Sequence, residues 1–195
     1  MVWLVIYIGL ALIFSFLCSV AEAVLLSITP SFIAGMEQEH PKRAELIKKL
    51  KQDNVDRSLA AILTLNTIAH TVGAIGSGSK ATAVFGSEWF GVFSAVMTLM
   101  ILFLSEIIPK TLGAVHWRNL AGPTAIFVRW LILVLYPLIV VSELLTKLIT
   151  KGKEVHVFSR EEFAAMAVVG ESSGHIDPDE SRIIHNLLRF GQLKA

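Results

Sequence analysis

Oxygen-bearing side chains stand inside three long apolar runs of this sequence. Ser15, Ser19 and Glu22 follow one another at helical spacing in the first run. Asn66 lies in the second run, and Glu106 lies at the end of the third. Such groups are costly in lipid, so they mark either a function or tight helix packing. Because nearly all of them are oxygens, with little thiolate or imidazole, they favour a hard cation such as Mg²⁺, Na⁺ or Ca²⁺ over Zn²⁺ or Cu⁺.

The stretch LSEIIPKTLG, residues 104–113, places a carboxylate and a helix breaker at the end of an apolar run. Pro109 has no N–H to donate to the Ser105 carbonyl, and its ring pushes that carbonyl aside. This releases a backbone oxygen next to the Glu106 carboxylate, a combination that suits a cation. Broken helices are tolerated in membranes where they line a cavity. The alternative is a span that ends here, with Glu106 and Lys110 in solvent; the spacing alone favours neither.

The first two runs also carry stripes of small residues, which allow helices to pack closely without any ligand. The stripe in the first run consists of Ala11, Ser15, Ser19, Ala23 and Ser27. Close packing is the better explanation of this stripe, but it does not explain Glu22. The stripe in the second run consists of Ala69, Gly73, Ser77 and Ala81. We expect part of this second stripe to pack against another subunit.

The polar residues of the second run differ in what they indicate. One helical face carries Asn66, His70, Gly73 and Ser77. The amide oxygen of Asn66 is a good ligand for a hard cation. His70 by itself indicates a hydrogen bond between helices rather than a metal ligand.

Composition excludes several classes of protein. Of the 195 residues, 54% are hydrophobic and 17% are charged, and the net charge is +1. The apolar residues are concentrated in long runs, as in integral membrane proteins, and no basic excess points to nucleic acid. A single cysteine, Cys18, excludes an intrachain disulfide and a cysteine-rich metal site. The sequence contains no P-loop, nucleophile elbow or His-Glu metalloprotease motif, so an enzyme is the least supported class.

Three runs are long enough to span a membrane, which takes about 20 mostly apolar helical residues. They cover about residues 2–28, 59–85 and 90–108. The first is a retained span rather than a signal peptide, because no Lys or Arg precedes Lys42. The segment 31–57 holds six basic residues and the turn 86–89 holds none. The positive-inside rule therefore places the 31–57 segment in the cytoplasm and the N-terminus outside.

Two juxtamembrane helices are expected, over about residues 31–53 and 121–149. Pro41 suits the first turn of a helix in the earlier segment. The apolar run 121–149 has basic residues on both flanks, including Arg118 and Lys151. We therefore expect it to lie in the cytoplasmic interface or to re-enter the membrane, the alternative being an ordinary fourth span.

Residues 151–195 are polar in character and predict a short, acidic, helical linker in the cytosol. Ser159 and Glu162 form a capping box at the start of one helix. Asp177 and Pro178 predict the start of a second. The segment is too short to build a large core of its own.

Three motifs together resemble a known family. SFLCSVAEAVLLS (15–27), LNTIAHTVGA (65–74) and SEIIPKTLGA (105–114) resemble, in order and spacing, the signature stretches of the CorC/CorB and cyclin M (CNNM) magnesium transporter membrane domain. The resemblance covers about residues 1–150, and the segment from Ser159 resembles the acidic linker that follows in that family. The implied fold is an all-α integral membrane domain.

The resemblance implies a homodimer in the cell membrane, with three spans per subunit, belt-like juxtamembrane helices, an outside N-terminus and a cytoplasmic C-terminus. It also implies Mg²⁺ binding in an inward-open cavity and Na⁺-coupled Mg²⁺ efflux by alternating access. The family's ligand positions fall on Ser19, Asn66 and Glu106, with nearby backbone carbonyls. Its first-span acid falls on Glu22, to which we assign coupling or Na⁺ binding. Supporting or coupling roles are expected for Ser15, Thr67, His70, Ser77, Ser105, Pro109 and Lys110.

Members of that family continue into a nucleotide-binding CBS pair. We therefore expect this chain to be part of a longer protein, and ATP to bind only outside it. Two other functions stay open: a non-transporting membrane anchor or sensor for a cytoplasmic regulatory module, and a transporter or channel for another ion or an organic substrate. Mg²⁺ binding and cation competition distinguish them.

Overall fold

The computed structural model describes residues 1–150 and 160–190, and every regular element in these residues is helical. Three helical segments are long and apolar enough to cross a membrane: Val2–Ser27, Val55–Phe85 and Ser87–Val115. The predicted all-helical class with three spans and additional shorter helices is thereby confirmed. The chain divides into two compact units, Met1–Ile149 and Thr150–Ala195.

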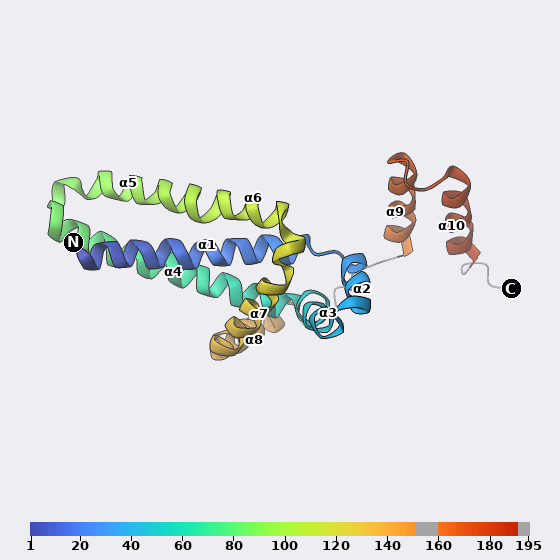
Figure 1. The fold of residues 1–195 in the computed structure, drawn as a ribbon, viewed down its shortest axis with the longest axis horizontal. Helices are drawn as coiled ribbons and strands as arrows, with labels where there is room; N and C mark the ends of the chain where they lie inside the picture. Colours follow the sequence, from blue (N-terminus) through green and yellow to red (C-terminus); the bar gives the residue numbers. More distant parts are fainter. Residues whose placement is uncertain (151–159, 191–195) are drawn as a thin grey trace. The chain divides into compact units, whose positions relative to one another are not determined.

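The first unit is built around α1 (Val2–Ser27), which contacts both other spans (Figure 1). The second span is a single helix, α4 (Val55–Phe85). The third span consists of α5 (Phe90–Met100), the π-helical segment η3 (Ile101–Ile107) and α6 (Ile108–Val115), preceded by the short turn η2 (Ser87–Trp89). Gly86 ends α4 with φ +89°, a conformation that glycine adopts without strain. The N-terminus lies at the same end of the bundle as this turn (Figure 1).

The sequence predicts that the third span ends at about residue 108, just before Pro109. In the structure the span continues past the proline to Val115. Its helix continues to Val115 because the backbone widens first. In η3 the Ile108 N–H bonds to the Phe103 carbonyl, five residues back, which is a π-helical turn. Pro109 then falls in the first turn of α6, where a missing N–H costs little.

Small residues bring α4 against α1. Ala69, Gly73 and Ser77 are all buried, and a Cβ placed on Gly73 would collide with the side chain of Ala11. The expectation that this stripe packs against another subunit is therefore wrong for Gly73, which packs within its own chain. A small-residue stripe specifies close approach of helices, but it does not specify which helix approaches.

A glycine likewise allows α6 to approach α1 closely. A Cβ on Gly113 would lie 2.8 Å from the Val20 carbonyl oxygen and 2.9 Å from the Ala23 side chain. Both distances are shorter than real contacts, so only glycine fits here. The backbones of α1 and α6 thus approach closely at the level of Ser19 and Glu22.

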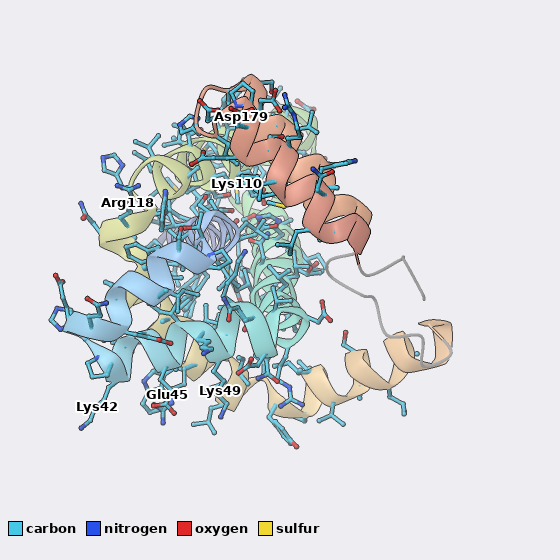
Figure 2. The ribbon with its side chains drawn as sticks, turned by 90° about the vertical axis from the view of Figure 1, so that its right-hand side faces the viewer. Lys42, Glu45, Lys49, Lys110, Arg118 and Asp179 are labelled. Atoms are coloured by element: carbon cyan, nitrogen blue, oxygen red, sulfur yellow. The ribbon has the colours of Figure 1, made fainter. Side chains whose placement is uncertain are left out.

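Two short helices replace the single juxtamembrane helix expected near residues 31–53. They are α2 (Pro30–Glu39) and α3 (Pro41–Lys48), followed by a π-helical segment η1 (Lys49–Asp53). Each helix starts with proline, whose missing N–H is tolerated in a first turn. Thr29 caps α2 by accepting a hydrogen bond from the Phe32 N–H at 3.3 Å. Figure 2 shows Lys42, Glu45 and Lys49 directed outward from this segment.

Lys51 ties this segment to the end of α1. Its ammonium donates to the Leu26 carbonyl at 3.1 Å, where a helix leaves its last carbonyls without internal partners. Burial lowers the pKa of Lys51 below its ordinary value. Positive charge at a helix C-terminus is favourable, so the contact suits both groups.

The apolar run after the third span forms two helices, α7 (Trp117–Val134) and α8 (Tyr136–Thr150). They meet at an angle of 82°. Pro137 stands in the first turn of α8, where it cannot continue the α7 hydrogen-bond ladder. The pair counts as a fourth span only if the bent unit crosses as one. The interfacial or re-entrant placement of 121–149 stays a prediction.

The apolar core joins α1 and α4 to α2, α3, η1, α7 and α8. Its buried residues are Cys18, Ala21, Val24, Leu25, Ile28, Ile33, Ile47, Leu50, Ala61, Ile62, Ala121, Ala125, Val128, Leu131 and Ile139. Phe32 of α2 and Trp117 of α7 pack edge to face, with ring centroids 4.8 Å apart. Residues from α2, α3 and α7 thus fix the end of α1 that carries Ser19 and Glu22.

The second unit is described from residue 160 to residue 190. It consists of α9 (Arg160–Ser172) and α10 (Pro178–Phe190), which pack together. The predicted helix start at Asp177 is confirmed: its carboxylate accepts from the Asp179 N–H at 2.9 Å. The capping box expected from Ser159 and Glu162 lies outside the described residues.

The contact of Gly73 with Ala11 yields a stability prediction. Gly73→Ala should lower the free energy of unfolding by about 1–3 kcal/mol, because the added methyl overpacks the α1–α4 contact. Gly9→Ala is the control, since nothing lies within 4 Å of its Cβ position. Thermal unfolding in detergent measures both. Ala11→Gly should restore part of the loss, and an unchanged midpoint in Gly73→Ala would contradict this packing.

Candidate functional site

Glu106 lies at the centre of a polar cluster formed by all three spans. Its Oε1 accepts a hydrogen bond from the Asn66 side-chain amide of α4 at 3.2 Å. His70, one turn further along α4, places Nε2 3.8 Å from the same oxygen, a pair that is charged only when the imidazole is protonated. The Glu106 side chain is 24% exposed, so the carboxylate is neither sealed in the bundle nor a solvated helix end.

A second carboxylate joins the cluster through Lys110. The Lys110 ammonium lies 3.1 Å from Glu106 Oε2 and 3.2 Å from Glu22 Oε2. Glu106 and Lys110 stand four residues apart in the third span, whereas Glu22 comes from α1. Two carboxylates and one ammonium leave one net negative charge on these three residues.

Ser15 of α1 connects the cluster to both neighbouring spans. Its hydroxyl is hydrogen-bonded to His70 Nε2 of α4 and lies 3.5 Å from the Ser105 carbonyl, to which it donates. This is the carbonyl that cannot receive an N–H from Pro109. Ser105 itself is fully buried, and its hydroxyl donates to the Ile101 carbonyl at 2.7 Å.

Two buried side-chain oxygens of the spans that form the cluster lack any hydrogen-bond partner within the described part of the chain: Ser19 Oγ of α1 and Asn66 Oδ1 of α4. Ser19 shares the α1 face of Ser15 and Glu22, about one turn from each. Asn66 gives its amide N–H to Glu106, which leaves the amide oxygen free to accept. Buried polar atoms are nearly always paired, so unpaired ones call for an unseen partner or a functional reason. Oxygens that accept nothing else are suited to a cation.

The donor set determines which cation fits. Among the described residues no three His, Cys, Asp or Glu side chains come together as a metal site. The oxygen groups on these parts of the three spans are instead the Glu106 carboxylate, the Asn66 amide oxygen, the Ser19 hydroxyl and the Ser105 carbonyl. Oxygen-only sets of this kind suit Mg²⁺, Ca²⁺ or Na⁺.

Most of the residues predicted from the sequence lie in or beside this cluster, and two do not. Thr67 donates to the Leu63 carbonyl and lines a separate groove of about 590 Å³ together with Asp56 and Leu138. Ser77 is buried, and its hydroxyl donates to the Ala74 carbonyl of its own helix at 3.3 Å.

Sequence reasoning did not anticipate the π-helical segment η3 or the pairing of Glu22 with Lys110. The i, i+4 spacing of Glu106 and Lys110 was a usable signal for half of that pairing. Nothing in the spacing connects Glu22 to Lys110, because they belong to different spans.

The unpaired Ser19 hydroxyl yields a test in metal-free buffer. Ser19→Ala should leave the free energy of unfolding within about 0.5 kcal/mol of the wild type, because no hydrogen bond is lost. Ser58→Ala is the matched control. Ser58 is equally buried but donates to the Leu50 and Asn54 carbonyls, so its loss should cost about 1–2 kcal/mol. Equal losses in thermal unfolding would mean that Ser19 has a structural partner.

Comparison with known proteins gives the same assignment as the motifs. The family described as the cyclin M transmembrane N-terminal domain matches residues 6–180. A UPF0053 protein of Synechocystis is 34% identical over 186 residues, which cover 95% of this chain and 54% of that protein. A chloroplastic DUF21 domain-containing protein of Arabidopsis thaliana is 28% identical over 192 residues, covering 96% of this chain and 28% of its own length.

The UPF0053 inner membrane protein YfjD of Escherichia coli is 19% identical over 131 residues, covering 67% of this chain and 30% of its own length. The chain therefore spans about half the length of the cyanobacterial relative and less than a third of the other two. The family match confirms the resemblance seen in the motifs. This chain belongs to the cyclin M transmembrane domain family, a multi-pass membrane family that is associated with Mg²⁺ transport and is not an enzyme family.

Proposed function

We propose that this domain binds Mg²⁺ between its three spans and exports it by alternating access, with Na⁺ as the coupling ion. The observation that carries the proposal is the pair of unpaired oxygens: Asn66 Oδ1, on the residue that binds the Glu106 carboxylate, and Ser19 Oγ, on the α1 face that carries Ser15 and Glu22. Mg²⁺ is the transported substrate, not a resident cofactor. An anchor without transport activity has no use for unpaired oxygens inside its bundle.

Each ligand has a distinct task in this proposal. Mg²⁺ requires near-octahedral oxygen ligation at about 2.0–2.1 Å and gives up water reluctantly. Glu106 supplies the one full negative charge that offsets dehydration, while Ser19 and Asn66 add neutral oxygens. The Ser105 carbonyl is a further candidate, because its bond to Ser15 is long at 3.5 Å. Binding would draw α1, α4 and the third span together, which gives alternating access a physical origin.

The whole protein adds further elements to the proposal. We assign Glu22 to Na⁺ coupling, since it lies beside the Mg²⁺ ligands without being one of them. The transporter works as a homodimer in the cell membrane. ATP acts through a CBS pair outside this chain.

The proposed orientation places the N-terminus outside and the helices α2, α3, α7 and α8 on the cytoplasmic side. Cysteines introduced at positions 118 and 151, in a Cys18→Ala background, should react with a membrane-impermeant maleimide only after the cells are permeabilised. Glu88→Cys, in the turn between the second and third spans, should react in intact cells. Labelling of 118 and 151 on opposite sides would show that the α7–α8 segment crosses the membrane.

Glu106 gives the direct test of ion binding. Glu106→Gln and Glu106→Ala should abolish Mg²⁺ binding in titration calorimetry and Mg²⁺ flux in vesicles with imposed Na⁺ gradients. Ser19→Ala and Asn66→Ala should weaken binding less, because each removes a neutral oxygen. Glu88→Gln, the same change at an exposed turn residue, is the control. Size-exclusion chromatography confirms folding, and wild-type affinity in folded Glu106→Gln would refute the proposed site.

A further inference from the structure

Lys110 stands where a cation between two carboxylates would stand. Its ammonium lies 3.2 Å from Glu22 Oε2 and 3.1 Å from Glu106 Oε2. Ion pairs at these distances are charge-assisted hydrogen bonds, about twice as strong as neutral ones. The lysine thus joins α1 to the third span by charge, as a bound metal ion would.

In this arrangement both carboxylate oxygens of Glu106 have partners. Its Oε1 accepts from Asn66 and its Oε2 contacts Lys110. A divalent ion on Glu106 Oε2 would lie next to the ammonium, and two positive charges a few ångströms apart repel strongly in a site of reduced polarity. The ion and the ammonium therefore cannot share this carboxylate oxygen.

The Lys110 side chain is able to move away from Glu106. Its side chain is 45% exposed, and a lysine carries its charge on a flexible four-carbon stem that readily moves its head group into water. It stands in the first turn of α6, the helix that follows the π-helical segment η3. No comparable freedom belongs to Glu106, whose side chain is 24% exposed and held on both oxygens.

We propose that Lys110 is a tethered counter-cation of the transport site: it neutralises Glu22 and Glu106 when no ion is bound and competes with the entering ion for Glu106. The proposal rests on the proposed Mg²⁺ site and adds a regulating residue to it. The competition limits Mg²⁺ affinity, and return of the ammonium to Glu106 drives release. Removal of the charge should therefore tighten binding and slow turnover.

The test compares Mg²⁺ binding and flux in the wild type and Lys110→Met. We expect Kd to fall about tenfold, because one close repulsive charge is removed. In flux assays the half-saturating Mg²⁺ concentration should fall together with the maximal rate. A structural defect would raise the half-saturating concentration instead. Lys110→Arg, which keeps the charge, should not tighten binding. Lys80→Met, which removes a charge about 21 Å further along α4 than Asn66, should retain wild-type affinity.

A second pair of variants covers the case in which Lys110→Met fails to fold because Glu22 and Glu106 repel each other. Glu22→Gln should weaken Mg²⁺ binding, because Lys110 then pairs with Glu106 alone. Adding Lys110→Met to Glu22→Gln should tighten it again. Unchanged or weaker Mg²⁺ binding on removal of Lys110, in a folded background, would overturn the tethered-cation proposal alone. Absence of Mg²⁺ binding in the wild type and in every variant would overturn the proposed function and this inference with it.

Discussion

The Glu106 carboxylate, placed inside a candidate membrane span, is the constraint that the rest of the bundle satisfies. An isolated charge in lipid is expensive, so it needs partners from neighbouring helices. Asn66 donates to it from α4, and Lys110 pairs with it from the next turn of its own span. These contacts require close helix approach, which Gly73 and Gly113 provide against α1. The glycines and the carboxylate are therefore parts of one arrangement.

The π-helical segment η3 adapts the third span to this requirement. A π-helical turn admits one extra residue per turn and is frequent at functional sites. Here it spans Ile101–Ile107, which includes both Ser105 and Glu106, and it ends just before Pro109. The wider turn accommodates the proline, which has no N–H, so the helix continues. The Ser105 carbonyl accepts a hydrogen bond from the Ser15 hydroxyl instead. The helix breaker thus alters the span without ending it.

Much of the architecture could be predicted from the sequence, because its signals are strong and local. Long apolar runs predicted the three spans, and Pro41 predicted the start of α3. The pairing of Asn66 with Glu106 could be anticipated from residue type, since polar side chains in lipid need hydrogen-bond partners on neighbouring helices. The helix that packs against each small-residue stripe could not be predicted, because small side chains allow close approach by any helix. The positions of Thr67 and Ser77 could not be predicted either: Thr67 lines a separate groove, and Ser77 lies about 16 Å along the helix from Asn66.

The central claim is that oxygens from three spans hold one divalent cation. Anomalous diffraction from crystals soaked in Mn²⁺, an ion that prefers the same oxygen ligands as Mg²⁺, tests it most directly. The account predicts an anomalous peak within about 2.3 Å of Ser19 Oγ, Asn66 Oδ1 and the Glu106 carboxylate. It also predicts that the Lys110 ammonium has moved away from Glu106. A peak elsewhere, or no peak while Lys110 still bridges Glu22 and Glu106 at saturating Mn²⁺, would contradict the account.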